Sequence, residues 1–140
     1  MDIVIDANIL FAIIIRRGIT ERILFSDELH LYAPEYLILE FKEHKEYLLT
    51  LTNRSEDEFL RLIEVLERRI ELIPTSEFKQ HVQAAEALVS DKDDAVYLAV
   101  CLAKRMPLWS NDNHFTKQDK VRVFTTQKLI KYLALDETES

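Results

Sequence analysis

Four acidic residues stand where a folded chain could gather them for chemistry. Asp6 directly follows the apolar run at residues 3–5, and Asp112 lies two residues beyond a later apolar run. Asp94 falls in the first turn of an expected helix, and Glu40 lies on another, one position from its apolar stripe. Carboxylates at such places hold metal ions or transfer protons.

Convergence of these four carboxylates would require a cation. Like charges a few ångströms apart repel one another and push part of the group towards the neutral form. Oxygen ligands favour Mg²⁺ or Mn²⁺ over Zn²⁺, and the sequence has neither paired Cys nor closely spaced His. One or two such ions could activate water and stabilise the oxygens of a phosphodiester during in-line displacement.

The elements that must position these acids follow from an alternation of short strand-like runs and helical stretches. The strand-like runs occupy residues 3–5, 31–33, 71–73, 108–110 and 121–124. This alternation predicts a three-layer α/β fold, with a parallel sheet of about five strands flanked by helices. Ligands of open parallel sheets bind outside the carboxyl ends of the strands, so Asp6 and Asp112 are expected to face one crevice.

Capping signals and periodicity predict the helices. One helix is expected from Pro34 to about Thr52. A capping box of Ser55 and Glu58 begins the next, which ends near Arg69. The remaining helices are expected over residues 78–89, from a cap at Asp91 or Asp93 to residue 102, and from Thr125 or Thr126 to Leu133.

Composition limits the class of protein. Of the 140 residues, 48% are hydrophobic, so we expect one domain over residues 1–135 and an acidic tail over residues 136–140. The single glycine, Gly18, excludes dinucleotide loops and P-loops, which need several glycines. The single cysteine, Cys101, excludes an internal disulfide framework and is expected to be a buried thiol.

Charge and hydropathy limit location and partners. A net charge of −7 argues against binding nucleic acid through a basic surface. The longest apolar run, Ile9 to Ile15, has seven residues, whereas a membrane-spanning helix needs roughly 20. Asp2 and Asp6 stand where a signal peptide would carry positive charge, so we expect a cytoplasmic protein with no membrane partner.

These residues resemble the PIN-domain family of metal-dependent ribonucleases, whose signature is four dispersed acids on a five-stranded α/β fold. The resemblance covers residues 1–135 and rests on VIDANIL (4–10), Glu40 in LILEFKEH, DKDDAVYLA (91–99) and LWSNDNHF (108–115). It implies an endoribonuclease that leaves a 5′-phosphate and a 3′-hydroxyl. The metal-binding and catalytic residues that it implies are Asp6, Glu40, Asp94 and Asp112, supported by hydrogen bonds from Asn8 and Ser110.

One position departs from the family pattern. Many members have a further acid two residues after the last metal ligand, where this chain has His114, which leaves the number of metal ions open. His114 could take a proton from water or contact a phosphate. Many small members are toxins of toxin–antitoxin pairs, and the resemblance implies a homodimer inhibited by a small antitoxin protein.

The first predicted helix carries two further expectations. Its apolar run, Ile9 to Ile15, exceeds what one helix face needs. The helix is therefore either fully buried or shared between the core and a dimer interface, and we expect the second. Arg16 and Arg17 at its end could hold an RNA backbone beside the acidic crevice or could lie solvated.

Two other functions stay open on the sequence alone. A receiver-like phospho-acceptor domain shares these layers and an Asp at a strand end, but it needs a Lys after the last strand, where this chain has Thr125 and Thr126. A catalytically inactive scaffold that binds a protein partner would keep the fold without affinity for metal. Glu40 taken alone is typical of a solvated helix residue, so its role depends on the family pattern.

Overall fold

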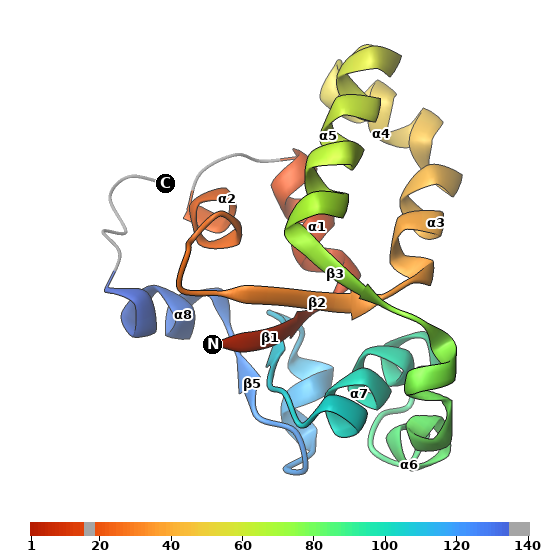
Figure 1. The fold of residues 1–140 in the computed structure, drawn as a ribbon, viewed down its shortest axis with the longest axis vertical. Coiled ribbons are helices and arrows are strands. Elements are labelled where there is room, and N and C mark those ends of the chain that lie inside the picture. The colour runs from red at the N-terminus through yellow and green to blue at the C-terminus, as the bar shows by residue number, and fades with distance from the viewer. Residues whose placement is uncertain (16–18, 135–140) are drawn as a thin grey trace.

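A parallel sheet lies between two layers of helices (Figure 1) in this computed structural model, which describes residues 1–15 and 19–134. The described strands are β1 (Asp2–Ile5), β2 (His30–Pro34), β3 (Ile70–Ile73), β4 (Leu108–Trp109) and β5 (Val123–Phe124). Neighbouring strands all pair in parallel, in the order β3-β2-β1-β4-β5. The predicted α/β class and five-stranded parallel sheet are confirmed.

Helices cover both faces of the sheet (Figure 1). One side carries α1 (Ala7–Ile15), α2 (Ile19–Leu24), α3 (Tyr36–Glu43), α4 (Lys45–Thr52) and α5 (Glu56–Arg69). The other side carries α6 (Val82–Glu86) and α7 (Lys92–Lys104). The last helix, α8 (Thr126–Leu133), contacts α2 and β5. Short 3₁₀ helices are η1 (Thr75–Glu77), η2 (Lys79–His81) and η3 (Asn113–Lys117).

The strand order reverses next to β1. The chain adds β2 and β3 on one side of β1 and then crosses to build β4 and β5 on the other. Ile5 pairs with Trp109 in the parallel register of β1 and β4. The segments that leave these two strands therefore start side by side, at the kind of switch point where open α/β sheets bind ligands.

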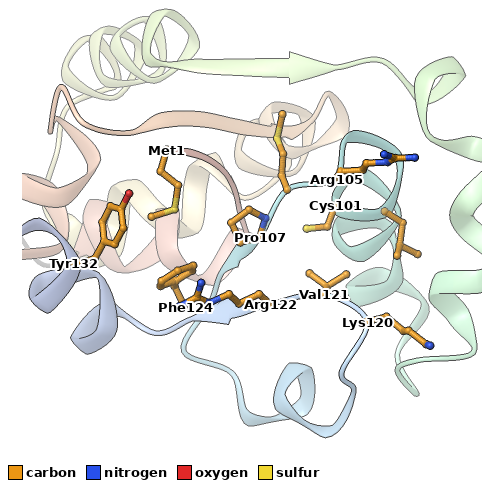
Figure 2. Close-up of a pocket in the computed structure, with 11 residues that line it drawn as sticks. Met1, Cys101, Arg105, Pro107, Lys120, Val121, Arg122, Phe124 and Tyr132 are labelled. Carbon is orange, nitrogen blue, oxygen red and sulfur yellow. The ribbon is translucent and has the colours of Figure 1, made fainter.

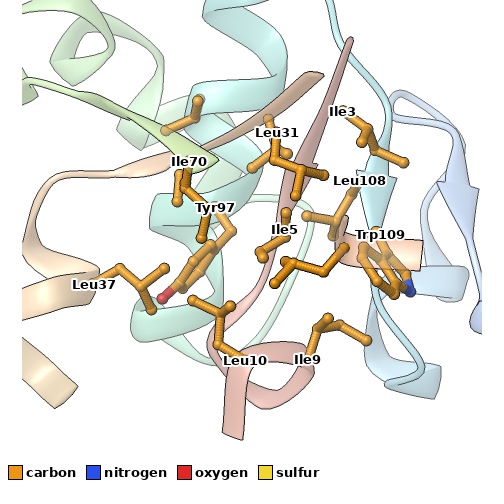
Figure 3. Packing of buried hydrophobic residues seen from close by; sticks show 14 of the residues in the cluster. Ile3, Ile5, Ile9, Leu10, Leu31, Leu37, Ile70, Tyr97, Leu108 and Trp109 are labelled. Carbon is orange, nitrogen blue, oxygen red and sulfur yellow. The ribbon is translucent and has the colours of Figure 1, made fainter. Parts of the chain in front are cut away.

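The core surrounds β1. Ile3, Val4 and Ile5 are all completely buried, as expected of a parallel strand that is covered on both faces. Figure 3 shows side chains of β1, α1 and β4 packed together, with Trp109 among them. The buried indole N–H of Trp109 donates to Thr126 Oγ1 at 3.1 Å, which fastens the start of α8 to the end of β4.

The helix predicted from Pro34 to Thr52 is wrong in two respects. Pro34 is the last residue of β2, and the helix is divided at His44 (φ −95°, ψ 14°) into α3 and α4. The His44 N–H still donates to the Glu40 carbonyl at 3.1 Å, so the chain bends without losing that hydrogen bond. The ring of Phe11 on α1 packs 4.7 Å from that of Phe41 and 6.1 Å from that of His44. The bend is thus a tertiary effect with no local Gly or Pro signal.

The helix predicted over residues 78–89 is replaced by η2 and the short α6. Phe78 leaves helical geometry (φ −132°, ψ −4°) while its side chain is 2% exposed. Burial of this ring therefore overrides local helix propensity. The helix caps predicted from the sequence are confirmed. Ser55 and Glu58 form a capping box, Asp91 caps α7 and Thr125 caps α8.

Burial along α1 and α7 follows the sequence patterns in part. On α1, four of the apolar residues are buried and Ile15 is 45% exposed. The dimer interface expected there stays a prediction. Cys101 on α7 is 1% exposed, so the predicted buried thiol is confirmed. Among the described residues, no helix is both long and apolar enough to cross a membrane.

Arg69 fastens the connection between α2 and β2. Its Nε donates to the Leu24 carbonyl at 2.6 Å, and its Nη2 donates to the carbonyls of Ser26 and Leu29. One half-buried guanidinium thus bonds three carbonyls of this connection, and that of Ser26 also accepts from the Leu29 N–H at 3.2 Å.

We expect Arg69→Met to lower the free energy of unfolding by about 2–4 kcal/mol, because hydrogen bonds from charged donors each contribute roughly 1.5–3 kcal/mol and do not add fully. Urea denaturation measures the change. The matched control is Arg68→Met, which removes the exposed neighbouring arginine and should change stability by less than about 0.5 kcal/mol. Equal losses in the two variants would contradict this role.

Candidate metal centre

Asp6 places a buried carboxylate at the carboxyl end of β1. Its side chain is 3% exposed. Oδ1 accepts a hydrogen bond from the Ile9 backbone N–H at 3.0 Å, and Oδ2 accepts one from the Ser110 hydroxyl at 2.5 Å. The first bond uses a free N–H at the start of α1, and the second follows from the pairing of β1 with β4. Both carboxylate oxygens are therefore fixed in position.

The environment of Asp6 opposes its charge. Burial, with smaller contributions from the charges of Asp112 and Asp94, raises the pKa of Asp6 to about 6, although the hydrogen bonds from Ser110 and Ile9 lower it. Buried carboxylates usually have a cationic partner. Within residues 1–15 and 19–134, no basic side chain forms an ion pair with Asp6. A metal ion would supply the missing positive charge.

Asp94, Asp112 and His114 form a group with metal-ligand geometry. Each offers one ligand atom, and these atoms all lie within 4.8 Å of one another. Asp112 Oδ1 accepts from the His114 backbone N–H at 2.9 Å and lies 3.3 Å from His114 Nδ1. The Asp112 N–H donates to Ser110 Oγ at 3.0 Å, so Ser110 bridges Asp6 and Asp112.

Asp94 reaches this group from the first turn of α7. The cap of α7 is Asp91, whose Oδ1 accepts from the Asp93 N–H at 2.8 Å. Asp94 is thereby left without a capping role. Burial raises its pKa, and the charges of Asp91 and Asp112 add to that effect. The free N–H groups at the helix start keep a negative charge tolerable there.

Glu40 stands apart from the other three predicted acids. It is half-buried on α3 and does not belong to the group of ligand atoms described above. Burial raises its pKa, followed by the charge of Asp93. The charges of Asp112 and Asp94 act on Asp6, whereas the largest acidic influence on Glu40 comes from Asp93, and no hydrogen bond among the described residues joins Glu40 to the other three acids.

Two tyrosines that the sequence patterns did not single out lie beside these acids. The Tyr36 hydroxyl donates to the Asp93 carbonyl at 3.4 Å, and its ring lies 5.9 Å from that of Tyr97. Tyr97 is 4% exposed, and its buried hydroxyl has no hydrogen-bond partner among the described residues. Helical spacing could have found both, since Tyr97 follows Asp94 by three residues and Tyr36 precedes Glu40 by four.

Both phenols are neutral donors at physiological pH. Burial raises the pKa of Tyr36 to about 12. The pKa of Tyr97 is also raised, first by burial and Tyr36 and then by the charges of Glu40 and Asp6. The Tyr97 hydroxyl thus lies within the electrostatic reach of both carboxylates, and it is the one buried side-chain polar group in the described residues that lacks a partner.

The remaining predicted site residues differ in placement. Ser110 is completely buried and bonds Asp6 as expected. Asn8 is exposed on the first turn of α1, and no hydrogen bond joins it to a site acid among the described residues. Arg16 and Arg17 lie outside the described residues.

The donor set suits a hard divalent ion. Three carboxylates supply oxygen, and the single imidazole adds one nitrogen. Carboxylate oxygens select Mg²⁺, Ca²⁺ or Mn²⁺, and a nitrogen ligand moves the preference from Mg²⁺ towards Mn²⁺. The buried, unpaired carboxylate of Asp6 is the feature that fits such an ion best.

Comparison with known families gives one match. The family model of the PIN domain matches residues 4–134, which covers every acid described above. Among curated proteins, no sequence matches this chain with significance.

Proposed function

The chain belongs to the PIN-domain family, and we propose that it is a metal-dependent endoribonuclease that hydrolyses RNA phosphodiesters. PIN domains are generally nucleases, which supports phosphodiester hydrolysis and argues against the receiver-like alternative. The observation that carries the proposal is the buried carboxylate of Asp6, which has Asp94 and Asp112 beside it and no basic partner among the described residues.

Each side chain of the centre has a role in this proposal. Asp6, Asp94 and Asp112 would hold Mg²⁺ or Mn²⁺, His114 would add a nitrogen ligand, and Glu40 would be the fourth acid of the site. The bound ion would supply a nucleophilic water and neutralise charge on the phosphate. Ser110 orients Asp6 and Asp112 through its two hydrogen bonds. The exposed imidazole of His114 would otherwise contact the phosphate of the RNA.

An RNA cleavage assay tests the proposal. RNA incubated with the protein and Mn²⁺ should give fragments with 5′-phosphate ends, and EDTA should stop the reaction. We expect Asp112→Asn to lower the rate by about 100-fold or more, because it removes a charged ligand. Cleavage that survives both EDTA and this substitution would refute the proposal. If neither cleavage nor Mn²⁺ binding is seen, the chain is an inactive scaffold.

We expect Tyr97→Phe to reduce RNA cleavage about 3- to 10-fold, because the neutral hydroxyl lies within the electrostatic reach of Glu40 and Asp6. The free energy of unfolding without metal should stay level or rise, since a buried hydroxyl with no partner is removed. Single-turnover rates and urea denaturation measure the two effects. Tyr47→Phe, which alters a 64% exposed tyrosine, is the control. Unchanged cleavage by Tyr97→Phe would rule out this role.

We also propose that the protein acts as the toxin of a toxin–antitoxin pair and forms a homodimer. Helices α3 to α5 support a protein-binding surface, because four large apolar side chains there are 46–64% exposed: Leu39, Tyr47, Leu51 and Leu60. Large apolar side chains left exposed on neighbouring helices are often protein contacts. Light scattering gives the oligomeric state, and growth arrest on induced expression tests the toxin role.

A further inference from the structure

A second concave site lies at the amino ends of the strands, opposite the metal centre. It has a volume of about 520 Å³. Met1, Pro107 and Val121, which line it, all come before or at the start of a strand (Figure 2). Asp6 and Ser110, by contrast, follow their strands. The two sites therefore lie toward opposite ends of the strands, with Phe124 at the end of β5 as the lining residue nearest Ser110 in the sheet.

The walls of this site, which we call the amino-end pocket, are mainly apolar. Met106, Val121 and Phe124 line it together with the buried thiol side of Cys101. Burial raises the pKa of Cys101, so this wall carries no thiolate charge. Apolar pockets of roughly 300–1,000 Å³ are the usual size of small-molecule sites. The walls suit a flat apolar group.

Three cations surround these apolar walls. Arg105, Lys120 and Arg122 line the amino-end pocket, and all are exposed. None of them forms an ion pair with any residue that the structure describes, whereas Lys45 and Lys104 elsewhere pair with glutamates. The Arg122 guanidinium lies over the ring of Phe124, 4.4 Å from its centroid. Positive charge without acidic partners around an apolar hollow favours an anion.

Arg105 occupies a backbone position that suits another residue type. It ends α7 in the left-handed region (φ 56°, ψ 49°), where glycine or asparagine is preferred. An arginine at this position costs the fold about 1 kcal/mol relative to glycine. The Arg105 side chain therefore lines the amino-end pocket although its backbone conformation lowers the stability of the fold.

We propose that the amino-end pocket binds a small organic anion that carries a flat apolar group. The apolar group would lie against Met106, Val121 and Phe124, and the carboxylate, sulfonate or phosphate would meet Arg105 and Arg122. The shape and charge of the pocket carry this assignment, which is independent of the nuclease function.

Fluorescence titration of the full chain with 1-anilinonaphthalene-8-sulfonate tests the proposal. We expect saturable binding of one probe per chain, with a dissociation constant on the order of 10–100 μM. Arg122→Gln and Arg105→Gly should each weaken binding about fivefold or more, because each removes a cation from the pocket. Arg61→Gln, an exposed arginine on α5, is the matched control and should change binding less than about twofold.

Stability measurements distinguish a loss of probe binding from a folding defect in a variant. Arg105→Gly should keep or raise the free energy of unfolding, because glycine suits the left-handed backbone. A variant that is as stable as the wild type and binds the probe more weakly supports the assignment. Equal binding by all variants would overturn it. Binding that appears only after deletion of residues 136–140 would also overturn it, in favour of the acidic tail as the occupant.

Competition distinguishes two sources of such an anion. Displacement of the probe by a nucleoside 5′-monophosphate, but not by the uncharged nucleoside, would assign a nucleotide. Displacement by 2-naphthoate, but not by the nucleotide, would assign an aryl carboxylate. If the uncharged nucleoside competes as well as the anions, the charge plays no part and the proposal fails.

Discussion

Replacing Asp6 with asparagine should abolish RNA cleavage while making the metal-free protein more stable. Cleavage should fall by about 100-fold or more, because the central charged ligand is lost. Stability should rise because burial holds the pKa of Asp6 at about 6, above its ordinary value of 3.8. Asparagine can still accept from the Ile9 N–H and bond Ser110 without carrying a buried charge. The gain above pH 7 should be about 1–3 kcal/mol.

The sign of the pH dependence follows from the direction of that shift. The folded state binds the Asp6 proton more tightly than the unfolded state does, so its contribution is present at low pH and is lost as pH rises from about 3.8 to about 6. The stability difference between Asp6→Asn and wild type should therefore be small near pH 4 and largest above pH 6.5. An asparagine variant that is less stable at pH 8 would contradict the prediction.

Urea denaturation in EDTA at several pH values measures this difference. Asp119→Asn is the matched control, since it neutralises an exposed aspartate away from the site and should leave the stability profile unchanged. Loss of RNA cleavage together with a gain in stability distinguishes a functional role of Asp6 from a structural one. A purely structural Asp6 would lose stability when it is replaced, whereas a residue kept for a bound cation gains stability without that cation.

The sequence predicts the position of Asp6 well because two independent regularities agree there. A strand that is buried on both faces reads as a continuous apolar run, and the residue after it must lie at the carboxyl end of the sheet. The same reasoning places Asp112 after β4. The Ser110 hydroxyl meets Asp6 because Ile5 pairs with Trp109, a register that no local pattern in the sequence encodes.

The features that the sequence failed to predict arise from packing over long distances. The bend at His44 follows from contacts with Phe11 on another helix. Tyr97 reads as one more apolar residue of α7, because only the fold shows that its hydroxyl is buried without a partner. Glu40 matches the family pattern, yet its carboxylate does not belong to the group formed by Asp94, Asp112 and His114.

The net charge of the protein limits the ways in which it could bind nucleic acid. The value of −7 excludes a nucleic-acid binder that depends on a basic surface. It does not exclude a metal-bridged complex, because part of the negative charge gathers at Asp6, Asp94 and Asp112. A divalent ion bound there would reverse the local field that a phosphate meets. Affinity for RNA should therefore depend on the ion more than on total charge.

Binding of Mn²⁺ should strongly raise the free energy of unfolding of the wild-type protein. The increase should grow with the number of acids that the ion contacts. A ligand at 100 times its dissociation constant stabilises the folded state by about 2.7 kcal/mol. Binding requires ionised carboxylates, so Mn²⁺ competes with the proton that burial favours on Asp6. Its affinity should rise with pH up to about 6 and then level off, and below that pH binding should release protons.

Thermal denaturation and calorimetry with Mn²⁺ rank the contributions of individual residues. Asp94→Asn and Asp112→Asn should remove most of the stabilisation, because both acids belong to the group within 4.8 Å. His114→Gln should weaken Mn²⁺ binding about 3- to 10-fold and Mg²⁺ binding less, since nitrogen ligands suit Mn²⁺ better. Glu40→Gln should have a smaller effect than either aspartate variant, because the Glu40 carboxylate does not belong to that group. If Asp119→Asn lost as much stabilisation as Asp94→Asn, the ion would be binding elsewhere and this metal centre would be wrong.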